Sequence, residues 1–195
     1  EGNNFPLAMN PKDGQDGVAG LTIATTAMSG GAGAADVEAS YAPVAGERYY
    51  SIVSGLSGAT TRLALVAEMN RRHDAVVQLL GQAFVGLRGT FAGMITEADS
   101  SNSVFLTAMA SSSSLTPPWE WAAQAAAHDT RKPDPATPYD GLALSGLDAP
   151  ALTDRPDKGE RDARLAGGVA TFKVSGSTIV LDRLVTTRSE DDGGN

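Results

Sequence analysis

The chain has 195 residues, 42% of them hydrophobic and 19% charged, which is the composition of a folded protein with a core and excludes a largely disordered chain. Its net charge of -8 disfavours nucleic acid as the main partner, because binding to phosphates requires clustered Lys and Arg. The sequence contains no cysteine, which excludes disulfides, thiolate catalysis and thiolate metal ligands and suits a reducing compartment.

No apolar run approaches the roughly 18 residues of a membrane span, so no membrane partner is expected. We expect a single domain over residues 1–195, with two small domains as the alternative. Residues 1–17 are rich in Gly, Pro, Asn and Asp, and residues 188–195 are polar, so both segments are expected to be flexible ends. The sequence begins without Met and stops directly after a predicted strand, from which we expect a fragment of a longer protein.

The first predicted elements are a strand over residues 18–28, a glycine-rich turn and a helix. Gly31 and Gly33 lie where a dinucleotide-binding fingerprint would lie, between the strand and the helix. The third small residue of that fingerprint falls on Asp36, which places a carboxylate where the pyrophosphate must approach. We therefore expect an ordinary turn with Asp36 as the helix N-cap, and a nucleotide-binding module is kept as an alternative.

The segment that follows begins with a predicted strand over residues 49–54 and continues with a helix from Thr60. This helix has an apolar stripe at a spacing of three and four residues, formed by Val66, Met69, His73, Val76 and Leu80. A break of the helix near His73 is left open. Because His73 lies on the stripe, we interpret it as a hydrogen-bonded core residue rather than a ligand or a base.

Short apolar runs at residues 81–87 and 103–110 predict two further buried strands. Thr90 is the expected N-cap of a helix between them, over residues 91–98. Strands and helices that alternate at this spacing indicate crossover connections and a mainly parallel sheet.

A serine loop over residues 111–114 precedes a helix with a hydroxyl cap at Thr116 and prolines in its first turn. The helix continues through residues 122–128, and its alanine-rich face can approach a sheet closely. We expect Trp119 and Trp121 to pack the helix on the sheet rather than to form a ligand platform. Residues 129–138 contain three prolines and predict an exposed loop.

Two β-branched runs, residues 169–174 and 179–185, flank the dipeptide Gly176-Ser177 and predict a β-hairpin. Glycine at the first position supplies the positive φ that a type II′ turn requires. The predicted fold class is therefore α/β, with a mainly parallel central sheet flanked by helices and a C-terminal β-hairpin.

No catalytic constellation is recognisable in the sequence. Ala59 lies two residues after Ser57, and Ala143 lies two residues before Ser145, at positions where a Gly-x-Ser-x-Gly elbow requires glycine. A Ser-His-Asp triad would need one of the two histidines, His73 or His128. The carboxylate pairs, Glu160 with Asp162 and Glu190 with Asp191, lie in segments that are expected to be solvated, where their pKa values would not be pushed apart. We expect no catalytic, cofactor-binding or metal-binding residue and no enzyme activity, with a hydrolase of degenerate site as the alternative.

Three stretches, in this order, resemble the tail sheath proteins of Mu-like contractile-tailed bacteriophages. The first two are Gln82-Ala-Phe-Val-Gly-Leu-Arg-Gly89 and Thr116-Pro-Pro-Trp-Glu-Trp-Ala-Ala123. The third runs from Leu147-Asp-Ala-Pro-Ala-Leu-Thr-Asp-Arg155 through Glu160-Arg161 and Gly168-Val-Ala-Thr-Phe172 to Arg183-Leu-Val-Thr-Thr187. The sequence departs from that family at Arg164-Leu-Ala-Gly167, where members often carry an aromatic residue, and members continue well past Thr187.

The resemblance implies a structural subunit that polymerises around the tail tube and contracts during genome delivery. It implies an α/β domain of the subtilisin-like type without a triad, stacked hexameric rings of sheath subunits as partners, and a place in the virion after assembly in the host cytoplasm. Contact with the tail tube is implied for the C-terminal part that is missing here, and the isolated fragment is expected to be monomeric. The charged segment over residues 153–164 is the candidate for a contact between subunits, and a merely solvated helix is the alternative.

Overall fold

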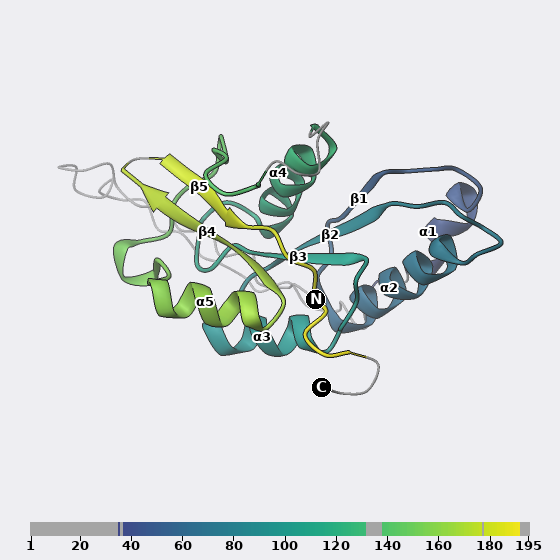
Figure 1. Ribbon diagram of the computed structural model, residues 1–195, viewed down its shortest axis with the longest axis horizontal. Helices are drawn as coiled ribbons and strands as arrows, with labels where there is room; N and C mark the ends of the chain where they lie inside the picture. The colour runs from purple at the N-terminus through teal and green to yellow at the C-terminus, as the bar shows by residue number, and fades with distance from the viewer. Residues whose placement is uncertain (1–34, 36, 132–137, 177, 192–195) are drawn as a thin grey trace, which may run out of the picture. The chain divides into compact units, whose positions relative to one another are not determined.

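The computed structural model describes residues 35, 37–131, 138–176 and 178–191 (Figure 1). The chain divides into two units, Glu1–Ala35 and Asp36–Asn195, and the elements below belong to the second. The strand predicted over residues 18–28, the glycines Gly31 and Gly33, and the end at residues 1–17 lie outside the described residues. The prediction of a single domain over residues 1–195 stays a prediction.

Within the described residues, the strands form one sheet in the order β1-β2-β3-β4-β5. The first four strands are parallel, and β5 runs antiparallel to β4. Their bounds are β1 Ser51–Ser54, β2 Gln82–Leu87, β3 Leu106–Ala110, β4 Val169–Ser175 and β5 Thr178–Arg183. The predicted α/β class with a mainly parallel sheet and a C-terminal hairpin is confirmed.

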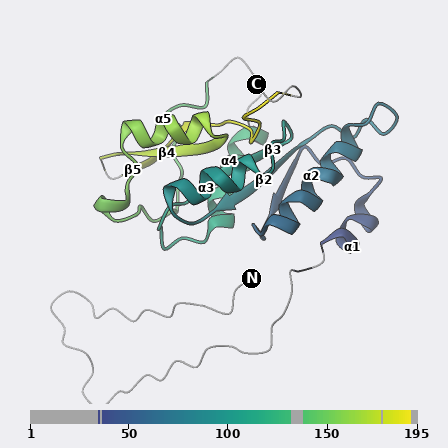
Figure 2. The same ribbon diagram turned by 90° about the horizontal axis from the view of Figure 1, so that it is seen from below.

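Helices cover both faces of this sheet (Figures 1 and 2). One face carries α2 (Ala59–His73), α3 (Phe91–Asp99) and α5 (Lys158–Ala166), and the opposite face carries α4 (Pro118–Arg131). A short helix α1 (Glu38–Tyr41) and a 3₁₀ turn η1 (Ala42–Val44) lie beside α2, and a second 3₁₀ turn, η2 (Leu152–Asp154), precedes α5. Connections between neighbouring parallel strands are right-handed. Because β1 to β4 follow one another in sheet order, this rule places the helices that directly precede β2, β3 and β4 on the same face of the sheet.

The interior strand β2 shows how the sheet separates two hydrophobic clusters. Its residues alternate between the faces: Ala83, Val85 and Leu87 join the cluster under α2 and α3, whereas Phe84 joins the cluster under α4. All four side chains are fully buried. A strand that is covered on both sides needs apolar residues at consecutive positions, which explains why this segment reads as a continuous apolar run.

Gly86 belongs to the α4 face of β2 and permits a close approach of the helix. A Cβ atom at this position would lie 1.8 Å from the carbonyl oxygen of Pro118, the first residue of α4. The small buried residues Ala122, Ala125 and Ala126 continue the contact along the helix. The predicted packing of an alanine-rich helix face against the sheet is therefore confirmed.

The helix α2 ends earlier than the predicted apolar stripe. It stops at His73, so Val76 and Leu80 lie beyond it, with 91% and 49% of their surfaces exposed. The chain leaves the helix because Asp74 is extended, with ψ of 144°, and its carboxylate accepts a hydrogen bond from the backbone N–H of Val76 at 2.9 Å. The extension of the stripe to these two residues is wrong, and the break that was left open near His73 is the observed one.

The predicted caps have different outcomes. Thr90 is the N-cap of α3, and its hydroxyl accepts from the backbone N–H of Gly93 at 3.2 Å, as expected. Thr116 lies two residues before the first residue of α4, and its hydroxyl accepts from the backbone N–H of Asp148 at 2.7 Å, so the predicted hydroxyl cap is wrong. The N-cap position of α1 is Val37 and not Asp36.

The predicted hairpin is confirmed, with Gly176 at a φ of +61° after β4. The strand β5 ends at Arg183, two residues before the predicted end, and a bulge interrupts the pairing between Thr171 and Phe172. The far edge of β5 is bonded to the segment before α5, since Leu181 exchanges backbone hydrogen bonds with Gly141 and Leu142.

An ion cluster fixes η1 and the following turn on α2. The Glu68 carboxylate accepts from Arg71 and from the buried Arg72, both at 2.7 Å, and Arg72 also donates to the carbonyl oxygens of Val44 and Glu47. The hydrogen bonds from Arg71 hold the pKa of Glu68 below its usual range, against the opposing effect of burial, and Arg72 adds to the same effect.

Candidate functional site

The two histidines are held by backbone groups. At the end of α2, Nδ1 of His73 lies 2.9 Å from the carbonyl oxygen of Met69, and Nε2 is the acceptor of a long hydrogen bond of 3.5 Å from the N–H of Gly81. The ring stacks on Phe105 at 3.7 Å between centroids. These contacts confirm a hydrogen-bonded His73, although the residue is half-buried rather than fully in the core.

His128 lies near the end of α4, where its Nε2 is 3.0 Å from the carbonyl oxygen of Ala143. In the described part of the chain, neither imidazole has a hydrogen bond to a serine hydroxyl or a carboxylate. The backbone carbonyls of Ser57 and Ser145 accept hydrogen bonds from Arg62 and Gln124, respectively. Among the described residues, these serines and histidines form no triad, and no triad was predicted.

The two tryptophans of α4 separate into a core residue and a surface residue. Trp121 is fully buried and contacts Phe172 of β4, with 4.5 Å between ring centroids. Trp119 is 44% exposed. The expected helix-to-sheet packing is therefore carried by Trp121.

The charged segment over residues 153–164 forms η2, a turn and α5. A capping box begins the helix: Asp157 accepts from the N–H of Glu160 at 2.8 Å, and the Glu160 carboxylate accepts from the N–H of Asp157 at 3.2 Å. Asp162 pairs instead with Lys158 at 2.6 Å, and this contact holds the pKa of Asp162 below its usual range. The carboxylates of Glu160 and Asp162 therefore serve the helix separately and do not form a dyad.

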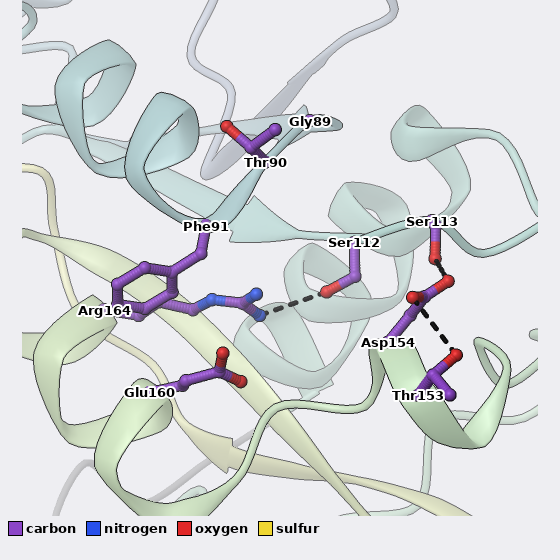
Figure 3. Close-up of a pocket in the computed structure, with 9 residues that line it drawn as sticks. All are labelled: Gly89, Thr90, Phe91, Ser112, Ser113, Thr153, Asp154, Glu160 and Arg164. Atoms are coloured by element: carbon purple, nitrogen blue, oxygen red, sulfur yellow. Dashed lines mark hydrogen bonds between the residues drawn. The ribbon is translucent and has the colours of Figure 1, made fainter.

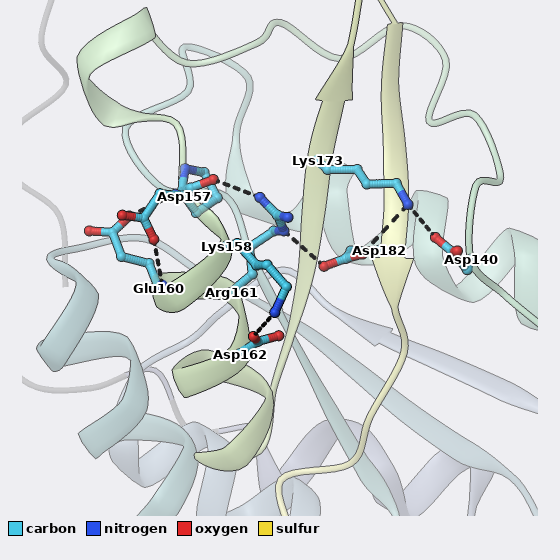
Figure 4. A network of polar contacts seen from close by, with 9 residues as sticks. Asp140, Asp157, Lys158, Glu160, Arg161, Asp162, Lys173 and Asp182 are labelled. Atoms are coloured by element: carbon cyan, nitrogen blue, oxygen red, sulfur yellow. Dashed lines mark hydrogen bonds and ion pairs between the residues drawn. The ribbon is translucent and has the colours of Figure 1, made fainter.

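Ion pairs connect α5 to the hairpin (Figure 4). Arg161 donates to Asp182 of β5 at 3.0 Å, and Lys173 of β4 lies 3.7 Å from the same carboxylate and 2.6 Å from Asp140. The hydrogen bond from Lys173 holds the pKa of Asp140 below its usual range. Part of the segment that was predicted to be exposed is thus bound to the domain's own sheet. The second carboxylate pair, Glu190 and Asp191, is exposed.

A cavity of about 250 Å³ lies at the carboxyl edge of the sheet (Figure 3). It is bounded by the segments that follow β2 and β3, by the first turn of α3, and by η2 and α5: Gly89, Thr90, Phe91, Ser112, Ser113, Thr153, Asp154, Glu160 and Arg164. In open parallel sheets, ligands bind outside the carboxyl ends of the strands. This rule could have located the cavity from the sequence, because residues 88–91 and 111–114 directly follow two predicted strands, but it was not applied there.

Arg164 of α5 lines this cavity and is only 3% exposed. Its Nη1 donates to the Ser112 hydroxyl at 3.1 Å, and its guanidinium carbon lies 5.5 Å from the centroid of the Phe91 ring. Burial lowers the pKa of the Arg164 guanidinium, and the charge of Glu160 acts in the opposite direction. The burial of Arg164 was not predicted, since the sequence places it in a segment that reads as a solvated helix.

The described residues contain no group of three or more His, Cys, Asp and Glu side chains that could hold a metal ion. None of the helices among them is long and apolar enough to cross a membrane. The proposed alternative site at Gly31 and Gly33 lies outside the described part.

Comparisons with known proteins agree with one another. A family model described as the phage tail sheath protein central domain matches residues 30–187. The Mu-like prophage FluMu tail sheath protein of Haemophilus influenzae is 28% identical over 188 residues, which cover 95% of this chain and 38% of that protein. The chain therefore spans about two fifths of the length of this curated relative. The crystal structure of a sheath tail protein from Desulfitobacterium hafniense has a similar fold, with a TM-score of 0.61 at 15% identity over 91% of this chain and 46% of that one.

Proposed function

Because the chain belongs to the phage tail sheath protein family, we propose that it is part of a structural subunit of a bacteriophage contractile tail sheath. The sequence resemblance to tail sheath proteins of Mu-like phages is confirmed by the family match and by the similarity to a Mu-like prophage sheath protein. The match over residues 30–187 is the observation that carries the proposal, since it includes every strand and helix of the described fold from α1 to β5.

In this role the protein polymerises around the tail tube, and the polymer contracts during genome delivery. The partners are other sheath subunits in stacked hexameric rings, and the tail tube is contacted through parts of a longer protein beyond this chain. The protein assembles in the host cytoplasm and is carried in the virion, and the chain by itself is a monomer. Subunits in such a stack meet through heterologous contacts, in which one face of a copy meets a different face of the next.

The proposed mechanical role is supported by packing and ion-pair contacts that make the domain rigid. The sheet is covered on both faces, Gly86 lets α4 lie directly on it, and ion pairs of Arg161 and Lys173 connect α5 and the loop at Asp140 to the hairpin. Packed interiors have low compressibility and transmit strain, which is what a subunit needs if it moves as a rigid body during contraction.

The proposal includes the absence of enzyme activity. A hydrolase with a degenerate site would depend on His73 or His128, and both rings are engaged with backbone groups. No specific observation favours the hydrolase or a nucleotide-binding module at Gly31 and Gly33 over the sheath subunit.

Negative-stain electron microscopy of the complete protein tests the proposal. We expect striated tubes of uniform diameter, which must also form when His73 and His128 are replaced by Gln, because the polymer needs no imidazole chemistry. A protein that stays dispersed under all polymerising conditions, or an esterase or protease activity that disappears with either His→Gln change, would contradict it.

A further inference from the structure

Within the described residues, the buried guanidinium of Arg164 forms no ion pair within 4.0 Å, and the nearby charge of Glu160 favours its charged form without such a contact. Its Nε atom is buried, and among those residues it has no hydrogen-bond partner. Its contacts are the hydroxyl of Ser112 and the ring of Phe91. A buried charge that is only partly hydrogen-bonded is costly, and an oxyanion in the cavity that Arg164 lines would lower this cost through its opposite charge.

A second feature favours an anion in the same cavity. The first turn of the nine-residue helix α3 opens onto it through Thr90 and Phe91. The Thr90 side chain and carbonyl accept from Gly93 and Met94, which leaves the N–H groups of Phe91 and Ala92 without an intrahelical acceptor. The positive end of the helix dipole and the guanidinium thus act on the same space. Figure 3 shows Arg164 directed toward Ser112, beside the start of this helix.

Two carboxylates on the wall make the cavity a poor site for a free anion. Asp154 accepts from the hydroxyl of Ser113 at 2.5 Å, and Glu160 is engaged in the capping box of α5. Both carboxylates carry charge that repels an anion from solution. Binding of a carboxylate therefore needs additional contact area that the same partner brings.

Exposed leucines beside the cavity offer that area. Leu115 and Leu152 have 82% and 78% of their surfaces exposed, and each lies two residues from one end of the hydrogen bond between Ser113 and Asp154. A protein partner can bury these side chains while one of its acidic residues enters the cavity. A second copy of this protein supplies such residues, because its 23 acidic side chains outnumber its 15 basic ones.

We propose that this cavity, flanked by Leu115 and Leu152, is a contact between sheath subunits in which an aspartate or glutamate of a second copy pairs with Arg164. The inference rests on the proposed function, which supplies the second copy. The proposed contact with the second copy therefore lies at the cavity behind α5. The other charged side chains of α5 form ion pairs and hydrogen bonds within the domain. An arginine suits this role because its planar guanidinium can bind a carboxylate with two parallel hydrogen bonds.

Polymerisation of the complete protein tests the inference. We compare the wild type with Arg164→Lys, with the double variant Leu115→Ser/Leu152→Ser, and with the control Val76→Ser, whose side chain is 91% exposed after α2. Both cavity variants are expected to raise the concentration required for tube formation at least tenfold, measured by sedimentation and microscopy, while the control behaves as wild type. The leucine variant keeps the test valid if the lysine variant folds poorly, because both leucines are exposed.

The outcomes separate this inference from the proposed function. If the wild type forms no polymer, the proposed function is overturned and this contact with it. If the wild type polymerises and both cavity variants polymerise equally well, the contact alone is overturned. A rise in the melting temperature of the wild type with acetate, lost in Arg164→Lys while polymerisation is unchanged, would identify a site for small anions and also overturn the contact.

Discussion

Replacement of Gly86 by Ala tests how closely α4 lies on the sheet. The new Cβ atom would lie 1.8 Å from the carbonyl oxygen and 2.2 Å from the carbonyl carbon of Pro118. The first separation is about 1.6 Å short of an ordinary 3.4 Å contact, and the opposing atoms belong to the backbone, which cannot rotate away. The helix must therefore retreat from the strand, and the packing of Trp121 and Ala122 must loosen with it.

The expected cost is about 3 kcal/mol or more, at the upper end for overpacked cores, because one methyl group displaces a whole helix end. For a chain of this size, 1 kcal/mol corresponds to a shift of about 2–4 °C in Tm, so Gly86→Ala should lower Tm by about 6–12 °C. Gly46→Ala is the matched control, since nothing lies within 4 Å of its added Cβ, and its free energy of unfolding should change by less than about 0.5 kcal/mol.

Urea unfolding followed by circular dichroism measures both variants against the wild type. The reasoning is refuted if Gly86→Ala is as stable as the wild type, or if the two glycine variants lose the same stability.

Three further predictions, which use four substitutions, test other parts of the fold by the same unfolding measurement. Trp121→Ala should cost about 3–5 kcal/mol because the side chain is fully buried, whereas Trp119→Ala, with 44% exposure, should cost less than about 1 kcal/mol; equal costs would contradict the assigned roles. Asp157→Ala should lower stability by about 1 kcal/mol through loss of the capping box, and an unchanged stability would show that α5 does not depend on it. The folded-state pKa of Glu68 lies below the usual 4.5, so its stabilisation is present above that value and is lost as the pH falls through the lowered pKa. Glu68→Gln should therefore lower the free energy of unfolding at pH 7, and this free energy should fall less steeply between pH 7 and pH 3 than in the wild type. An equally steep fall in the variant would contradict this role of Glu68.

Local sequence signals predicted much of the sheet. The positive φ of Gly176 favours a residue without Cβ, so the hairpin could be located from the dipeptide at its turn. Thr90 precedes a helix whose first turn needs an acceptor, and it provides one. The alternation of short apolar runs with helices led to the parallel strands, because such strands need crossover connections.

The predictions that failed depended on contacts from distant segments. Nothing local distinguishes Thr116 as a helix cap from Thr116 as an acceptor for Asp148, which is 32 residues away. The predicted stripe on α2 continued to Val76 because the periodicity did not weigh the turn-forming carboxylate of Asp74. In each case a polar side chain accepts a hydrogen bond that the spacing of apolar residues does not predict.

The cavity is the part that sequence reasoning missed. Its wall combines the ends of two strands with η2 and α5, and the sequence separation between Ser112 and Arg164 is 52 residues. Arg164 lies in a helix whose pattern is polar, so its burial follows from the packing of α5 beside β4 and α3 and not from the helix itself. A buried arginine on a polar helix can be recognised only when the neighbouring elements are in place.

The central claim is that this fold is a building block of a contractile sheath, and a cryo-electron microscopy reconstruction of the complete protein under polymerising conditions tests it most directly. We expect tubes in which the five-stranded fold repeats around a hollow centre, with the cavity at Arg164 closed by an acidic side chain of a neighbouring copy. Dispersed subunits that never form tubes would contradict the assignment as a sheath subunit.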